Sequence, residues 1–181
     1  MENKIILKPG REKSVLARHP WIFSGAIKEV RGDPELGSTV QVVDSSGDNL
    51  GLAAYSPVSS IRARMWGLNI KEVNADFLKD RIMRSVEMRR ELVPATETNS
   101  KRLIYAESDG IPGFVVDQYG EYLSVQILSA GPEYWRDTLF DVLKTMLNPI
   151  GIIERSDVDV RELEGLQPRS GLVYGEKIPE T

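Results

Sequence analysis

The sequence predicts an α+β protein, a small β-barrel followed by a layer in which helices pack on a sheet. Short apolar runs separated by glycine and proline fill residues 1–70, and such spacing is typical of a small barrel. Over residues 71–181, amphipathic helical patterns alternate with strand patterns, which indicates one sheet with helices against it. The 181 residues suffice for two small domains, which we predict to be 1–70 and 71–181, with the change of pattern near Gly67.

Six strands are predicted in the first segment, each ended by turn residues. Within Thr39–Val43, Val40 and Val42 share one face, as expected for a half-buried strand. In the last strand apolar side chains alternate with Arg62 and Arg64, which predicts that both arginines face solvent. The expected strands are Lys4–Leu7, Trp21–Phe23, Ala26–Val30, Thr39–Val43, Leu50–Tyr55 and Ile61–Trp66.

The second segment begins with a predicted helix. Ala75–Leu92 places Leu78, Ile82 and Val86 four residues apart on one face, and Pro94 follows as a helix-ending residue. A second helical pattern and five strand patterns complete the segment. They are the helix Glu133–Leu147 and the strands Leu103–Glu107, Phe114–Gln118, Tyr122–Leu128, Gly151–Glu154 and Gly171–Tyr174.

The charged residues are unevenly distributed. The net charge of -4 argues against a strong nonspecific nucleic-acid binder. Residues 1–70 carry nine Lys and Arg against seven Asp and Glu, a balance of +2, while residues 71–181 carry fourteen against twenty, a balance of -6. Five of the cations lie between Lys4 and Arg18, where Glu12 is the one acidic residue. This stretch predicts either a phosphate-facing patch or a solvated charged loop.

Several chemistries are disfavoured by what the sequence lacks. The absence of cysteine excludes disulfides and thiolate chemistry within these residues and favours a cytoplasmic protein. No apolar run approaches the ~20 residues needed to cross a bilayer, so no membrane partner is expected. With His19 as the one histidine, neither a metal site nor a Ser-His-Asp triad is predicted. No Gly-x-Gly turn or phosphate loop is present, so we expect no Rossmann-type cofactor pocket here.

Acidic residues at Glu107, Asp109 and Asp117 admit two interpretations. Two carboxylates across a hairpin can serve as general acid and base. Asp109 precedes a glycine, however, and an aspartate there accepts N–H bonds in a turn, so we favour the structural interpretation. The alternating charges over residues 155–164 likewise favour a salt-bridged or interdomain face over a substrate groove.

Three groups of motifs in order along the chain resemble one known family. They are His19–Ile27 with Ser60–Arg64; Arg102–Gly120 with Val125–Gln126; and Ile153–Asp157 with Glu162–Gly175. Together they resemble the bacterial ribosomal RNA large-subunit 5-methylcytosine methyltransferases. The resemblance implies that residues 1–70 form a PUA-type pseudo β-barrel, and that residues 71–181 form a central β-β-α-β-β (EEHEE-like) domain.

The same resemblance implies where the chemistry lies. Enzymes of this family continue into a Rossmann domain that binds S-adenosylmethionine and carries the cysteine that attacks cytosine C6. Neither is found in these 181 residues, so we expect a fragment of a longer protein. We therefore expect no catalysis and no cofactor in this chain, with S-adenosylmethionine bound by the parent protein.

The implied role of the fragment is to hold large-subunit ribosomal RNA so that a flipped base reaches the catalytic domain. Trp21 is a candidate for stacking on RNA, although Ile22 and Phe23 beside it also fit a core residue. Two other functions stay open: a stand-alone RNA-binding module, and a scaffold whose acidic second half contacts basic ribosomal proteins. The oligomeric state, including a homo-oligomer, is open as well. The predicted RNA-binding residues are Lys8, Arg11, Lys13, Arg18, His19, Trp21, Arg62 and Arg64.

Overall fold

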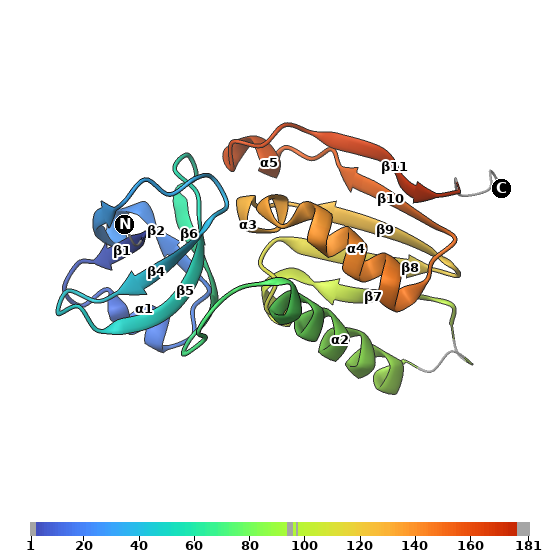
Figure 1. The fold of residues 1–181 in the computed structure, drawn as a ribbon, viewed down its shortest axis with the longest axis horizontal. Coiled ribbons are helices and arrows are strands. Elements are labelled where there is room, and N and C mark those ends of the chain that lie inside the picture. Colours follow the sequence, from blue (N-terminus) through green and yellow to red (C-terminus); the bar gives the residue numbers. More distant parts are fainter. Residues whose placement is uncertain (1–2, 94–95, 97, 177–181) are drawn as a thin grey trace.

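The structure is a computed structural model that describes residues 3–93, 96 and 98–176. Two β-sheets, each with its own helices, make up the fold. Figure 1 shows the two parts side by side, with the N-terminus in the first part and the C-terminus at the far end of the second. The α+β class predicted from the sequence is confirmed.

The first sheet is curled and has six strands in the order β2-β6-β5-β4-β1-β3. Strands β1 and β4 are parallel, and the other neighbours are antiparallel. Val40 and Val42 are buried in its core, so the alternation predicted for that strand is confirmed. A short helix that the sequence analysis missed, α1 (Glu12–Leu16), inserts Val15 into the same core. The strands are β1 (Lys4–Leu7), β2 (Trp21–Phe23), β3 (Ile27–Arg31), β4 (Thr39–Val43), β5 (Asn49–Tyr55) and β6 (Ile61–Gly67), with a 3-10 turn, η1 (Ser24–Ala26), after β2.

The second sheet has five strands in the order β11-β10-β9-β8-β7. Two helices, α2 (Ala75–Leu92) and α4 (Arg136–Leu147), lie across one face of it (Figure 1). The predicted stripe of Leu78, Ile82 and Val86 is buried against this sheet, and the Asn74 side chain caps α2 by accepting from an N–H of its first turn. Helix α2 ends at Leu92; Pro94 lies outside the described residues. The strands are β7 (Ser100–Tyr105), β8 (Phe114–Tyr119), β9 (Tyr122–Ile127), β10 (Gly151–Ser156) and β11 (Arg169–Gly175).

Two local predictions in this half were wrong. The helix expected at Glu133–Leu147 is two helices, α3 (Ala130–Tyr134) and α4, which meet at Trp135. The strand expected to reach Glu107 ends at Tyr105, because Ala106 has φ of 47° and opens the 3-10 turn η2 (Ala106–Asp109). The order β8, β9, α4, β10, β11 contains the β-β-α-β-β succession, but α2 and β7 precede it, and α5 (Val160–Leu163) lies before β11.

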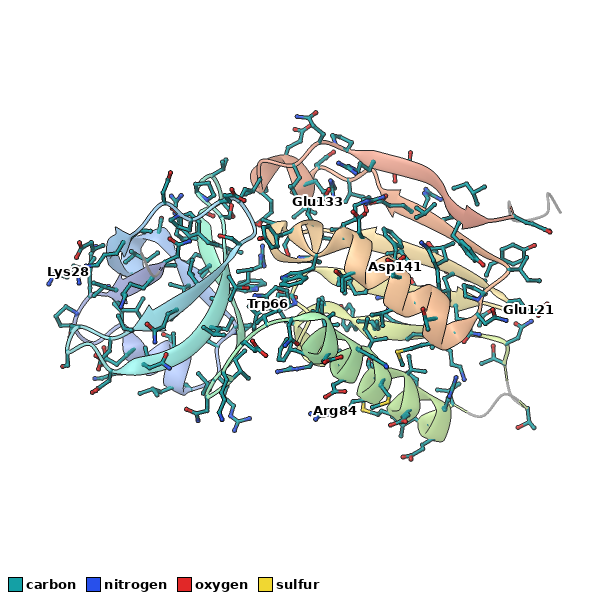
Figure 2. The ribbon with its side chains drawn as sticks, viewed as in Figure 1. Lys28, Trp66, Arg84, Glu121, Glu133 and Asp141 are labelled. Carbon is teal, nitrogen blue, oxygen red and sulfur yellow. The ribbon has the colours of Figure 1, made fainter. Side chains whose placement is uncertain are left out.

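The two halves share a hydrophobic core. Trp66 of β6 and Ala54 of β5 belong to the first sheet, yet both pack into the core of the second half. Figure 2 labels Trp66 where the two halves meet. Gly131 of α3 permits this contact, because a Cβ there would lie 2.6 Å from the Ala54 Cβ and 3.0 Å from Cζ2 of Trp66. The junction is therefore close-packed, with no room for one added methyl group.

Arg64 of β6 adds a polar connection across the junction. Its Nη1 lies 3.0 Å from Oε1 of Glu107 in η2, and its Nη2 lies 2.9 Å from Oε1 of Glu164, which follows α5. The prediction that Arg64 faces solvent was wrong, since its exposed fraction is 8%. The period of a strand assigns side chains to a face, but the second half of the chain covers the face that carries Arg64.

Arg62 also forms hydrogen bonds to groups of the protein. Its Nη1 donates to the main-chain carbonyl oxygens of Ser56 and Pro57, and the side chain is half-buried. The prediction of two free, solvent-facing arginines on this strand therefore does not hold for either residue. Arg64 serves the junction between the halves, and Arg62 closes the turn that leads into β6.

The packing at Gly131 predicts an unusual sign for a glycine substitution. Gly131→Ala would normally stabilise a helix by about 0.5–1 kcal/mol, because alanine lowers the entropy lost on folding. Here the added methyl would meet Ala54 and Trp66, so we expect a loss of about 1–3 kcal/mol through overpacking. Urea denaturation followed by circular dichroism measures the difference. Gly25→Ala is the matched control, since a Cβ at Gly25 meets open space, and a stabilised Gly131→Ala variant would contradict the packing.

The ion pairs of Arg64 predict a second stability effect. Arg64→Ala leaves the buried carboxylate of Glu164 without its cation, and such a loss costs about 3–5 kcal/mol. Arg62→Ala, which breaks only bonds to carbonyl groups, is expected to cost less than half as much. Equal unfolding midpoints for the two variants in urea would show that Arg64 does not hold the junction.

Candidate nucleic-acid interface

Three rings line up on the outer face of β2. Trp21 and Phe23 alternate with the buried Ile22, and His19 continues the same alternation just before the strand. The ring centroids of His19 and Trp21 are 6.0 Å apart, and those of Trp21 and Phe23 are 6.4 Å apart. Trp21 and Phe23 are 37% and 47% exposed, so Ile22 is the core residue and Trp21 lies at the surface.

Exposed cations flank this row. Lys8 donates to the carbonyl oxygen of Gly25, and Arg11 shares a groove of about 260 Å³ with Trp21 and Phe23. The predicted cations of this region, Lys8, Arg11, Lys13 and Arg18, are all exposed, and no ion pair holds any of them within the described ranges. We call the rings of His19, Trp21 and Phe23 together with these four cations the α1–β2 surface.

The ring of Trp21 is held in place from the second half of the chain. Its Nε1 donates to Oε1 of Glu107 at 2.7 Å, and the guanidinium of Arg64 lies 5.4 Å from the ring centroid. In the sheet register, Trp21 is also the direct partner of Arg64. A surface ring fixed by a hydrogen bond and a cation is preorganised for stacking, because little side-chain freedom remains to be lost.

The structure leaves six of the predicted residues exposed in or near α1 and β2, and it holds the other two in contacts with protein groups. The α1–β2 surface contains the six, with Lys13 placed there by its position in α1, and adds Phe23, which the sequence analysis did not select. The signal for Phe23 was present: residues 19, 21 and 23 share a face of an extended chain. Arg62 and Arg64 are held by the protein groups described above and do not join the surface as free cations.

The acidic residues are engaged in structural contacts. Asp109 forms two hydrogen bonds to Arg89, at 2.7 and 2.8 Å, and accepts the N–H of Tyr105. Asp117 is bound by both Nε and Nη2 of Arg102. The structural interpretation of these two aspartates is confirmed, because each carboxylate is occupied by an arginine.

The charged stretch after β10 also serves contacts between elements. Arg161 is buried and donates Nη1 to the carbonyl oxygen of Ile127 and to Oε2 of Glu133, while Glu164 binds Arg64 across the junction. The interdomain interpretation of this stretch is confirmed for Glu164. Over the part of the chain that the structure describes, no three acidic or histidine side chains gather as a metal ion would require. None of the helices described there has the length and apolar character of a membrane-spanning segment.

The chain is similar to several known proteins. Residues 5–67 match the family model of a PUA-like domain. Over 180 residues the chain is 43% identical to "Ribosomal RNA large subunit methyltransferase I" of Shigella dysenteriae, and equally identical to the protein of the same name from Escherichia coli O157:H7. These matches cover 99% of this chain but 45% and 46% of the relatives, so the chain spans slightly less than half of their length.

Solved structures show the same arrangement of both halves. A candidate SAM-dependent methyltransferase from Streptococcus mutans superposes with a TM-score of 0.79, and a candidate methyltransferase in complex with SAH superposes with a TM-score of 0.81. Each covers 99% of this chain, and this chain covers 45% and 44% of them, at 18% identity. At that identity the likeness establishes the fold alone. Residues 5–67 thus resemble a PUA-like domain, and the chain as a whole is homologous to slightly less than half of the ribosomal RNA large-subunit methyltransferases I.

Proposed function

We propose that this chain binds unpaired or looped RNA of the large ribosomal subunit through the α1–β2 surface. The observation that carries the proposal is the row of His19, Trp21 and Phe23, exposed on one strand and flanked by cations without ion pairs among the described residues. Rings presented on a strand stack on unpaired bases, which contributes about 1–3 kcal/mol per base. The flanking cations bind the phosphates on either side and set the register of the RNA.

The homology supports ribosomal RNA as the partner. The relatives are named as ribosomal RNA methyltransferases. The motifs quoted above resemble those of the ribosomal RNA 5-methylcytosine methyltransferases. We propose that this chain is the RNA-positioning part of such a protein. The donor S-adenosylmethionine and the attacking thiolate then belong to a further domain in cis, and this chain presents the flipped base to it.

The packing of the second half supports the assignment of the donor site elsewhere. In an open sheet, a cofactor of this kind binds where the chain turns from the carboxyl end of a parallel strand into a helix. Here that turn joins β9 to α3, where Ser129 donates to the carbonyl oxygen of Pro112 and the amide of Ala130 points to Glu164. Trp66 occupies the space beside Gly131. The turn is filled by the protein, so its residues do not fit S-adenosylmethionine.

The charge distribution disfavours the scaffold interpretation. The balance of -6 in residues 71–181 suggested a surface for basic proteins. In the structure, seven of those carboxylates form ion pairs with arginines, which leaves fewer carboxylates free to bind a basic protein. They are Glu107, Asp109, Asp117, Glu133, Glu154, Asp157 and Glu164.

Binding to RNA is expected to depend on both the rings and the salt concentration. Fragments of large-subunit ribosomal RNA should bind the chain, and contact with ~3 phosphates would weaken binding roughly twentyfold between 50 and 200 mM salt. Phe23→Ala should lower the affinity roughly tenfold through lost stacking, because Phe23 is exposed and makes no hydrogen bond that holds the junction. Fluorescence anisotropy of labelled RNA measures both effects.

The matched control removes a cation from another part of the same sheet. Lys28, labelled in Figure 2 on the far side of the first half, is exposed and lies on β3 at the opposite edge of the sheet from β2. Lys28→Met should leave the affinity within twofold, while Lys13→Met should lower it and flatten the salt dependence. An equal effect of the two substitutions, or no binding by the unmodified chain, would contradict the proposed surface.

Donor binding is expected to be undetectable in this chain. Calorimetry with S-adenosylmethionine up to about 1 mM should give no saturable heat, because the turn after β9 is filled by side chains. Labelled methyl groups should not be transferred to ribosomal RNA by this chain. A saturable signal, or label above a protein-free blank, would show that these residues hold a donor site that the packing does not reveal.

A further inference from the structure

A cleft of about 380 Å³ lies where the first half meets α2 and η2. One wall comes from the first half and includes Arg18 and His19, which also belong to the α1–β2 surface. The other wall comes from the second half and includes Arg81 of α2. The volume is in the range of small-ligand sites, and the cleft begins where the proposed RNA surface ends.

Arg81 is the exceptional residue of this cleft. Its guanidinium is half-buried and lies 4.9 Å from the ring centroid of Phe77, with Nη2 donating to the carbonyl oxygen of Trp66 at 3.2 Å. No carboxylate lies within ion-pair distance of it among the described residues. Burial, and secondly the charge of Arg84, lower the pKa of Arg81. Burying a guanidinium without a counter-charge costs free energy. The position of Arg81 therefore suggests that it binds an anion from another molecule.

The other arginines that are buried or half-buried differ from Arg81 in their partners. Each is matched inside the protein: four bind carboxylates, and Arg62 binds two main-chain carbonyl groups. The four are Arg64, Arg89, Arg136 and Arg161, with Glu107 and Glu164, Asp109, Glu154, and Glu133 as their respective partners. Among the described residues, Arg81 has the carbonyl oxygen of Trp66 and the ring face of Phe77 as partners, and no carboxylate.

Two glycines lie directly against the guanidinium of Arg81. Gly110 lies against it so closely that a Cβ there would collide with Nη1, and a Cβ on Gly67 would lie 3.2 Å from Nη2. Two glycines thus flank the charged group where other residues would place side chains. Glu107 also lines the cleft, but its Oε1 already accepts from Arg64 and Trp21, and Arg81 forms no ion pair with it.

Two residues on the first-half wall of the cleft have a left-handed backbone conformation. Arg18 has φ of 63° and Asn69 has φ of 57°, in the left-handed region that residues with a Cβ seldom adopt. Both residues line this cleft, and such conformations cluster where a ligand is held. Arg18 thus borders the same cleft as Arg81.

We propose that this cleft binds a phosphate group of the RNA, with Arg81 and Arg18 as its donors on opposite walls. The inference rests on the proposed RNA binding and extends it to the second half of the chain. An RNA strand that stacks on β2 continues into the cleft, where one phosphate supplies the counter-charge that Arg81 lacks. RNA is then held by both halves at once, and the bound phosphate adds to the contacts that fix their relative placement.

Arg81→Met tests the proposal, because methionine keeps an apolar stem over Phe77 and removes the charge. With fragments of large-subunit ribosomal RNA as the probe, we expect affinity to fall about tenfold and the slope of log K against log salt to decrease by ~0.7–0.9, the loss of one phosphate contact. Arg84→Met is the matched control: Arg84 is three residues away on the same helix, exposed, and labelled in Figure 2 where it points away from the sheet. Its affinity and slope should change little.

The thermal midpoint of Arg81→Met should equal or exceed that of the unmodified chain, since an uncompensated buried charge is removed. An affinity unchanged in Arg81→Met but lowered in Lys13→Met would overturn the phosphate site and leave RNA binding at the α1–β2 surface intact. Equal losses in Arg81→Met and Arg84→Met would also overturn it, because a general field effect would then explain both. Failure of the unmodified chain to bind RNA would overturn both proposals. Inorganic phosphate is the last probe, and stabilisation by phosphate that depends on Arg81 while RNA affinity does not would exclude an RNA phosphate as the occupant.

Discussion

The placement of the two halves depends on the side chain of Arg64. It reaches from β6 to carboxylates of two separate elements, Glu107 in η2 and Glu164 after α5, and it lies beneath the ring of Trp21. A buried pair of this kind contributes little net stability, because desolvation offsets most of the Coulomb attraction. The pair nevertheless restricts the geometry of the junction, because a shift of η2 or α5 would break an ion pair that is buried from water. The apolar contact of Trp66 with Gly131 supplies the attraction, and Arg64 specifies the orientation.

Through Glu107, the orientation of the halves reaches the proposed RNA surface. One carboxylate oxygen accepts both from Arg64 and from the indole N–H of Trp21. Trp21, which we propose stacks on a base, is therefore held by Glu107 of the second half, although it belongs to β2 of the first half. On this arrangement, a base bound at β2 is positioned relative to the whole chain and not to the PUA-like domain alone. The proposed presentation of one base to a catalytic domain requires such rigidity, because misplacement by about 1 Å is costly for catalysis.

Local periodicity predicted the elements well and their contacts poorly. The alternation in Thr39–Val43 and the four-residue stripe of α2 depend on neighbours in sequence, and both are confirmed. The burial of Arg64 depends on Glu107 and Glu164, which are 43 and 100 residues away, and no local pattern carries that information. The break at Trp135 was missed for a related reason: apolar residues on both sides of it satisfy one helical pattern, while the packing of α3 against the first half turns the chain.

In the candidate site, too, some residues could be predicted from local spacing and others could not. His19, Trp21 and Phe23 are recognisable from their spacing once the strand is placed, since residues two apart share a face. Arg81 is not, because in the helical pattern it is one of several cations on α2 and nothing distinguishes it from Arg84. Arg81 differs from Arg84 only in the folded chain, where the first half contacts Arg81 and provides a carbonyl group but no carboxylate. Among the described residues, each other buried or half-buried arginine has a carboxylate partner, or two carbonyl groups in the case of Arg62. Arg81 has no such partner, which is why we propose that it binds an anion from outside the chain.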